Sequence, residues 1–190
     1  MDPHDSYWDD VLTVARQGRA RLHREASVIM ASELPRWLVT ALRLPAVLYQ
    51  YGLGGLLGQR FLRITHRGRR SGRRYATVVE VVGRNRGSAE YVVISGFGAR
   101  ADWLRNIEAG SPILITVGGS LFVAAHRVLD PTEAEQVFAD YERRNRLVAP
   151  LIGRVLSALL GWRFDGSPHA RRRLAEQLPM VAFRPAANLG

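Results

Sequence analysis

The stretch from Thr65 to Arg74, THRGRRSGRR, concentrates positive charge in a turn between two segments that are typical of β-strands. Five arginines lie within eight residues, namely Arg67, Arg69, Arg70, Arg73 and Arg74. A guanidinium group can bind phosphate or carboxylate through two parallel hydrogen bonds, and backbone N–H groups in a glycine turn such as Ser71-Gly72 add further donors. The turn is therefore a candidate anion site. A solvated hairpin turn in an arginine-rich chain is the alternative, and the spacing alone favours neither.

A second stretch, ISGFGARADWLRN, runs from Ile94 to Asn106. Its first part, Ser95 to Gly98, ends a predicted strand, and a helix is expected to begin near Asp102. Small residues let a planar ligand approach the backbone closely, and the free N–H groups at a helix start favour an acceptor or anion. Trp103 could offer a flat face to a ligand or anchor the core, and taken alone the core is favoured.

Composition narrows the chemistry that these residues could support. The chain has 190 residues, a net charge of +10 and no cysteine, and all 27 of its basic residues are arginines. Disulfides, thiolate sites and a lysine Schiff base are therefore excluded. Between Glu33 and Glu80 lie nine arginines and no acidic residue, and such a field attracts phosphates, polycarboxylates, nucleic acid or an anionic membrane surface.

Other catalytic patterns are missing from the sequence. The five histidines are scattered without HExxH spacing, so no metal site is expected, and neither GxSxG nor a dinucleotide-binding glycine motif occurs. The acidic start, MDPHDSYWDD, is unlike a secretory signal, and the uncharged run at residues 44–59 is too short to span a bilayer. We expect a cytoplasmic protein, or one that is peripheral on the inner face of the membrane.

The elements that must position these motifs follow from the hydrophobic pattern. Helices are expected over about 5–30 and within 34–57, the second either packed on the core or in contact with a membrane. Strands are expected at 61–66, 75–82, 91–95, 112–117, 121–129 and 180–183. Helices are expected near 99–110, from Thr132 with Glu135 as a capping box, at 148–160 and at 167–177. The pattern predicts an α+β fold, mainly β, with a β-barrel of about six strands.

In combination, THRGRRSGRR with its following strand and YVVISGFGARADWLRNIEAGSP with a later VGG turn resemble the deazaflavin-dependent nitroreductase family. These are actinobacterial split β-barrel oxidoreductases that use reduced coenzyme F-420. The resemblance covers roughly residues 44–130, with a weaker match in LPMVAFRP. It implies a split barrel (residues 59–190) with C-terminal helices, preceded by an N-terminal helical segment (residues 1–58).

The resemblance also implies which residues hold the coenzyme. Its phosphate and glutamate tail would lie against the basic turn, with Thr77 on the following strand near the phosphate or the ring. The loop after the third strand would line the ring through backbone groups, and the next helix would complete the site. The cofactor-binding residues implied are Arg67, Arg69, Arg70, Ser71, Gly72, Thr77, Ser95, Gly96, Phe97, Gly98, Asp102, Trp103 and Asn106. No catalytic residue is assigned, and Tyr75, Ser95 and Tyr141 are the candidate proton donors.

The function so implied is hydride transfer from reduced F-420 to a small lipophilic acceptor such as a quinone, an enone or a nitroaromatic. One alternative is an FMN-binding protein on the same barrel. A second alternative is a non-catalytic basic module that docks on a membrane or on nucleic acid. Nucleic acid is disfavoured because the basic stretch has no interleaved aromatic residues for stacking bases. Peripheral membrane contact and a homodimer are further expectations.

Overall fold

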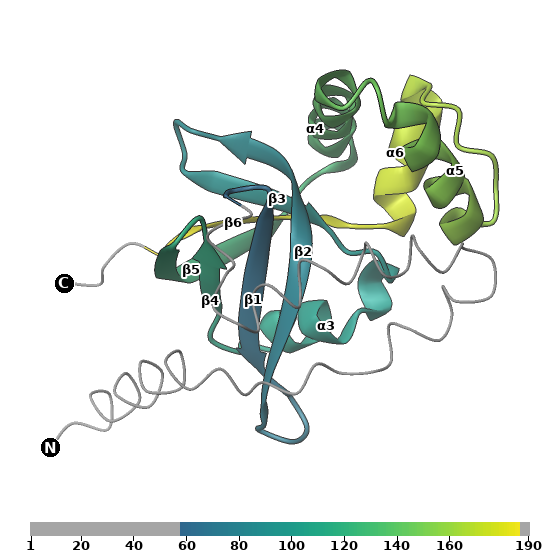
Figure 1. Cartoon of the computed structure of the whole chain (residues 1–190). Coiled ribbons are helices and arrows are strands. Elements are labelled where there is room, and N and C mark those ends of the chain that lie inside the picture. The colour runs from purple at the N-terminus through teal and green to yellow at the C-terminus, as the bar shows by residue number, and fades with distance from the viewer. Residues whose placement is uncertain (1–57, 187–190) are drawn as a thin grey trace, which may run out of the picture.

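The computed structural model describes residues 58–186, and its strands form a closed antiparallel barrel (Figure 1). The strands are β1 (Phe61–Arg67), β2 (Arg74–Asn85), β3 (Glu90–Ile94), β4 (Leu114–Val117), β5 (Ser120–Val128) and β6 (Met180–Pro185). Their order around the barrel is β1-β2-β3-β6-β5-β4. The predicted α+β, split-barrel-like fold of six strands is confirmed. β2 runs further than expected, because a bulge between Val81 and Gly83 lets it continue into the hairpin with β3.

The register of β1 places the basic turn. Leu62, Ile64 and His66 are buried, while the residues between them are only half-buried, as expected of a strand with one face on the core. His66 pairs with Tyr75, and Arg67 pairs with Arg74, in the antiparallel ladder between β1 and β2. The turn therefore consists of residues 68–73, and His66 lies where the row of core side chains meets it.

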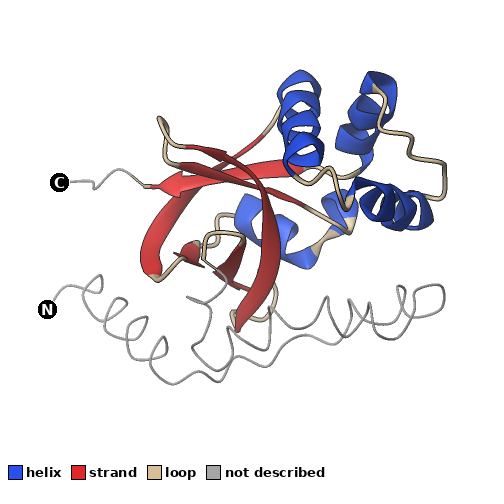
Figure 2. Ribbon diagram, turned by 45° about the horizontal axis from the view of Figure 1, so that its top comes forward, coloured by secondary structure: helices blue, strands red, loops and turns tan. Residues whose placement is uncertain are grey.

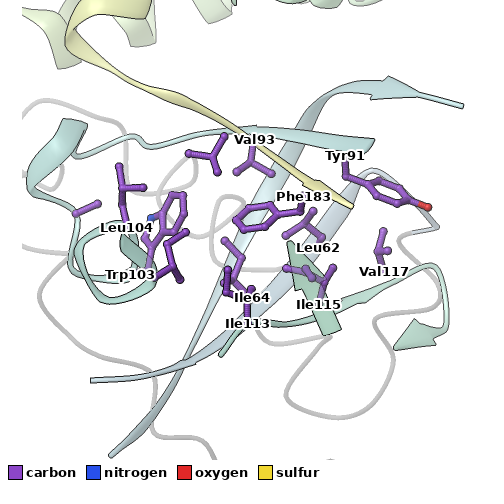
Figure 3. Packing of buried hydrophobic residues seen from close by; sticks show 14 residues of the cluster. Leu62, Ile64, Tyr91, Val93, Trp103, Leu104, Ile113, Ile115, Val117 and Phe183 are labelled. Carbon is purple, nitrogen blue, oxygen red and sulfur yellow. The ribbon is translucent and has the colours of Figure 1, made fainter. Parts of the chain in front are cut away.

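The barrel interior holds the first of two hydrophobic clusters, with Phe183 at its centre (Figure 3). A 3-10 turn, η3 (Gly98–Arg100), and helix α3 (Asp102–Glu108) follow β3. Three residues of α3 are buried in this cluster, namely Trp103, Leu104 and Ile107. Figure 3 shows Trp103 and Leu104 at one end of the cluster and Tyr91 at the other. The core thus holds α3 against the barrel, beside the β1–β2 turn.

Helices α4 (Pro131–Arg144), α5 (Ala149–Leu160) and α6 (Pro168–Gln177) gather on one side of the barrel (Figure 2). They pack over a second cluster, with Phe138 and Leu174 fully buried, that also includes Met180 of β6. The N-cap of α4 differs from the expectation. Asp130, not Thr132, is the cap, and its carboxylate accepts from the N–H groups of Thr132 and Glu133. Pro131 explains the difference, because proline suits the first helical position and so leaves Asp130 as the cap.

The helices expected over 5–30 and within 34–57 lie outside the described residues. The division of the chain into segments 1–58 and 59–190 therefore stays a prediction. Among residues 58–186, no helix is long and apolar enough to cross a membrane.

Candidate functional site

The basic turn is closed by its own backbone. The N–H of Gly68 donates to the carbonyl of Arg73, and the N–H of Gly72 donates to the carbonyl of Gly68, both at 2.8 Å. The N–H of Arg67 donates to Ser111 Oγ at 2.7 Å, which fastens the base of the turn to the segment after α3. The turn is therefore a defined loop with several backbone donors already used.

Gly68 leaves room for the Tyr75 ring to lie against the turn. A Cβ atom at residue 68 would lie 2.6 Å from the Tyr75 ring and 2.7 Å from Ser71 Oγ, so only glycine fits there without displacing them. The Ser71 and Tyr75 hydroxyl oxygens are 3.0 Å apart and share a hydrogen bond. The serine of the turn thus has a hydrogen-bond partner at the start of β2.

Arg69 joins the turn to α3. Its backbone N–H and its Nη1 both donate to Asn106 Oδ1, at 3.0 and 2.9 Å, and Nη1 also donates to Asp102 Oδ1 at 3.0 Å. The Asp102 side chain is 67% exposed, and an exposed ion pair contributes little. Asn106 is only 4% exposed, and a buried polar group that loses its partner is costly, so the amide contacts dominate. We call the contacts of Arg69 with Asn106 and Asp102 the Arg69 latch.

His66 is the third member of this network. Asn106 Nδ2 lies 3.2 Å from His66 Nδ1, while the carbonyl of Arg67 is more distant from Nδ1, at 3.5 Å. Because Asn106 Oδ1 accepts from Arg69, the amide nitrogen must face His66 and donate to it. His66 Nδ1 is then an acceptor, which makes the ring neutral with its proton on Nε2. Burial lowers the pKa of His66, and the Arg67 carbonyl and the Asp102 carboxylate partly oppose this shift.

We expect the free energy of unfolding to decrease as the pH is lowered, because of His66. A depressed pKa in the folded state means that the unfolded chain binds the proton more tightly, so stability is complete above the ordinary histidine pKa and is lost as pH falls below it. Urea unfolding measures how much of the free energy of unfolding is lost between pH 7.5 and pH 5.5. This loss should be smaller in His66→Asn than in the parent protein, because the Asn Oδ1 can accept in place of Nδ1. The exposed His169 is the matched control. If His169→Asn reduced the loss of stability between the two pH values as much as His66→Asn does, the assignment to His66 would be refuted.

The loop from Ser95 to Gly98 is held mainly by internal bonds. The Ser95 side chain is fully buried and donates to the carbonyl of Gly98 at 2.7 Å, while the backbone N–H of Ser95 donates to Pro179. Gly98 adopts a left-handed conformation, with φ of +63°, and a Cβ there would lie 2.8 Å from the carbonyl oxygen of Gln177. By contrast, Gly96 has open space around it, and Phe97 is 42% exposed.

The thirteen predicted cofactor-binding residues therefore fall into two sets. The side chains of the first set form the hydrogen bonds, ion pair and ring contact described for this site, and the second set comprises the remaining residues, most of which are exposed. The first set is Arg69, Ser71, Ser95, Asp102, Trp103 and Asn106, together with Gly98, whose role is conformational. The second set is Arg67, Arg70, Gly72, Thr77, Gly96 and Phe97. Contact of any of them with a cofactor stays a prediction.

For Trp103 the two alternatives are resolved in favour of the core. Its side chain is buried and its ring lies 6.2 Å from that of Phe183 in the barrel cluster. Thr77 is half-buried and pairs with Ile64, so the two side chains share the inner face of the barrel.

The three candidate proton donors lie in different surroundings. Tyr75 lies at the basic turn, in its hydrogen bond with Ser71. Ser95 is committed to the loop after β3. Tyr141 of α4 is buried in the second cluster, stacked on Phe138, and burial together with the nearby Glu80 carboxylate raises its pKa. Of the three, only Tyr75 adjoins the arginines of the basic turn.

The sequence analysis did not assign to the site three residues that shape it, namely His66, Gly68 and Ser111. His66 could have been identified by aligning the two strands about the turn, because that alignment sets His66 opposite Tyr75. No local signal points to Ser111, since its bond to Arg67 joins residues 44 positions apart. Within the described part of the chain, no group of three or more histidine or carboxylate side chains could hold a metal ion.

Comparison with known proteins gives remote structural likenesses alone. The sequence matches no protein-family model, and no curated protein matches it. Among solved structures, an F-420-H2-dependent reductase is 14% identical, with a TM-score of 0.40, and the match covers 67% of this chain and 96% of that one. A pyridoxamine 5'-phosphate oxidase-related, FMN-binding protein of Nostoc punctiforme is 12% identical, with a TM-score of 0.39, over 80% and 82% of the two chains.

A third structure, a protein of unknown function from Agrobacterium tumefaciens, is 14% identical, with a TM-score of 0.45, over 70% of this chain and 51% of that one. Likenesses this remote do not distinguish one cofactor or activity from another.

Proposed function

We propose that this protein is an oxidoreductase that transfers a hydride from reduced deazaflavin coenzyme F-420 to a small lipophilic acceptor. One observation carries the proposal. The two stretches that resemble the deazaflavin-dependent family are far apart in sequence, yet the Arg69 latch joins them directly. The basic turn therefore lies against α3, which directly follows the loop after β3, and this arrangement would allow a single coenzyme to contact both.

The arginines of the turn suit a polyanionic tail. Arg70 and Arg73 are exposed and Arg74 is half-exposed, and none of the three forms an ion pair within residues 58–186. The neighbouring Arg69 is held against α3 by its bond to Asp102. A series of guanidinium groups with no acidic partner can bind a phosphodiester and several carboxylates at once. FMN carries a single phosphate, so this series favours the deazaflavin coenzyme over FMN.

The open part of the loop after β3 suits a ring. Gly96 has no atom within 4 Å of the place where a Cβ would lie, so a flat group could approach its backbone. Phe97 beside it offers an apolar surface to a lipophilic acceptor. When bound, reduced F-420 would supply the hydride, and a proton from solvent or from the Tyr75 hydroxyl would complete the two-electron reduction of the acceptor. The protein's residues would bind the tail, orient the ring and exclude water.

The test is a titration of the purified protein with F-420 and, separately, with FMN, followed by tryptophan fluorescence. We expect micromolar F-420 binding that Arg70→Ala/Arg73→Ala weakens by about tenfold or more, because each substitution removes a charge-assisted contact. Arg86→Ala/Arg163→Ala removes the same charge from exposed positions outside both motifs and is the matched control.

Three results would contradict the proposal. Tight FMN binding without F-420 binding would move the chain to the flavin alternative. Equal weakening by both double variants would indicate general charge attraction. Binding of neither cofactor would leave the turn as a surface feature. If F-420 binds as expected, spectrophotometric oxidation of reduced F-420 with quinone, enone and nitroaromatic acceptors then tests hydride transfer itself.

A further inference from the structure

Helix α5 is mostly apolar, and its polar side chains are Arg154 and Ser157. One side packs on the protein, where Leu156 is buried and Ile152, Leu159 and Leu160 lie against the second cluster. The opposite side, with the turn before it, presents Leu147, Val148, Leu151 and Val155. We call these four residues the α5 apolar face. A helix with apolar residues on two sides normally buries both sides against other groups.

The α5 apolar face is unusually open. Leu147 is 90% exposed, Val148 43% and Leu151 40%. Three of the six exposed large hydrophobic residues within 58–186 thus lie within five positions of the chain. Isolated exposed hydrophobic residues need no explanation, but a contiguous group of this kind marks an interaction surface.

The charged residues around the α5 apolar face are all positive. Between Glu142 and Asp165 there are five arginines and no acidic residue. Arg143 pairs with Asp140, and Arg144 donates to the carbonyl of Val82, so these two are engaged within the protein. Arg146 and Arg154 are exposed and form no ion pair with any described residue. Arg146 precedes Leu147, and Arg154 is one helical turn after Leu151.

We propose that the α5 apolar face docks on an anionic lipid surface, with Leu147 and Leu151 inserted at the headgroup boundary and Arg146 and Arg154 on lipid phosphates. An apolar helix face bordered by arginines is the pattern of helices that lie in a membrane interface. A second copy fits less well, because a two-fold contact would bring like-charged arginines together with no acidic residue between them. This inference does not rest on the proposed function.

The α5 apolar face is separate from the basic turn, which permits a clean test. In Figure 1 the β1–β2 turn lies at the bottom of the barrel, whereas α5 lies at the right, beyond α6. Because the chain has no cysteine, single cysteines can carry an environment-sensitive fluorophore at chosen sites. Leu147→Cys reports on the α5 apolar face. Leu121→Cys, at an exposed leucine near the start of β5, is the matched control.

The experiment adds vesicles of phosphatidylglycerol and phosphatidylcholine, or of phosphatidylcholine alone, to each labelled full-length protein. We expect a blue shift and an intensity increase at residue 147 with the anionic vesicles, and no change at residue 121. Equal changes at both sites would overturn the proposal, and so would no change at residue 147. A blue shift at residue 147 before vesicles are added would show that another part of this protein, or a second copy, occupies the face.

Unlabelled variants then separate the apolar and charged contributions. We expect Leu147→Gln/Leu151→Gln to weaken vesicle binding by about tenfold or more, with the remaining binding abolished by salt. Arg146→Gln/Arg154→Gln should weaken it more than Arg86→Gln/Arg105→Gln, which has the same net charge. Because these side chains are exposed, circular dichroism should show all variants folded. Loss of binding only through the Arg86/Arg105 pair, or a change in oligomeric state with Leu147→Gln/Leu151→Gln, would refute the assignment to lipid.

Discussion

Gly98→Ala is expected to lower the free energy of unfolding by about 2–4 kcal/mol. Two causes add together at this position. The residue has φ of +63°, where an L-side chain is strained, and its Cβ would lie 2.8 Å from the backbone carbonyl oxygen of Gln177. A backbone atom at the end of α6 cannot rotate away, so either the loop or the helix end must move. Urea unfolding at neutral pH measures the loss directly.

Gly96→Ala in the same loop is the matched control. No atom lies within 4 Å of its Cβ position and its φ is not positive, so its stability should stay within about 0.5 kcal/mol of the parent protein. The pair also separates fold from function. If the ring of the coenzyme lies on Gly96, a bulky Gly96→Val substitution should weaken F-420 binding while leaving unfolding nearly unchanged. Equal destabilisation by Gly98→Ala and Gly96→Ala would contradict the conformational role assigned to Gly98.

The strands and the last three helices could be predicted because their signals are local. Aromatic and β-branched residues from Phe61 to His66 predict β1, and Ser167 ahead of Pro168 marks the start of α6. Where two local signals competed, the prediction failed. Thr132 with Glu135 resembles a capping box, but Pro131 has a fixed φ and no N–H, so the helix begins at that proline and Asp130 caps it.

The candidate site was predicted in outline but not in its internal contacts. Both motifs were found, because clustered arginines and a Ser-Gly-Phe-Gly loop are visible in the sequence. Their junction depends on Asn106, which lies 37 residues from Arg69 and 40 from His66. Only the pairing of β1 with β2 and the packing of α3 on β1 bring these side chains together. Polar residues that look like ligands, such as Ser95 and Asn106, therefore prove to have partners within the protein.

Asn106→Leu is expected to destabilise the protein by about 2–4 kcal/mol, because it removes both ends of a buried amide at once. Asn106 accepts two hydrogen bonds from Arg69 and donates one to His66. Without it, the buried His66 Nδ1 loses its nearest partner, and Arg69 retains only the exposed contact with Asp102. Urea unfolding at neutral pH measures the cost.

Local loosening of the turn can be measured apart from global stability. Trypsin cleaves after arginine, so faster cleavage after Arg69, Arg70 and Arg73 in Asn106→Leu would report release of the Arg69 latch. Cleavage after Arg86, in the β2–β3 hairpin, is the internal control, because the side-chain hydrogen bonds of Asn106 go to Arg69 and His66 and not to that hairpin. Acceleration at both sites alike would mean global unfolding and would refute a local role for the latch.

Asn106→Asp distinguishes the two ends of the amide. A carboxylate still accepts from Arg69, so the turn should stay protected from trypsin, but it cannot donate to His66 Nδ1. The carboxylate would instead favour a protonated His66 that donates to it, which raises the pKa of His66 where burial now lowers it. The contribution of His66 to stability would then be present at low pH and lost as pH rises, the reverse of the parent protein. An unchanged pH dependence in Asn106→Asp would mean that Asn106 does not set the protonation state of His66.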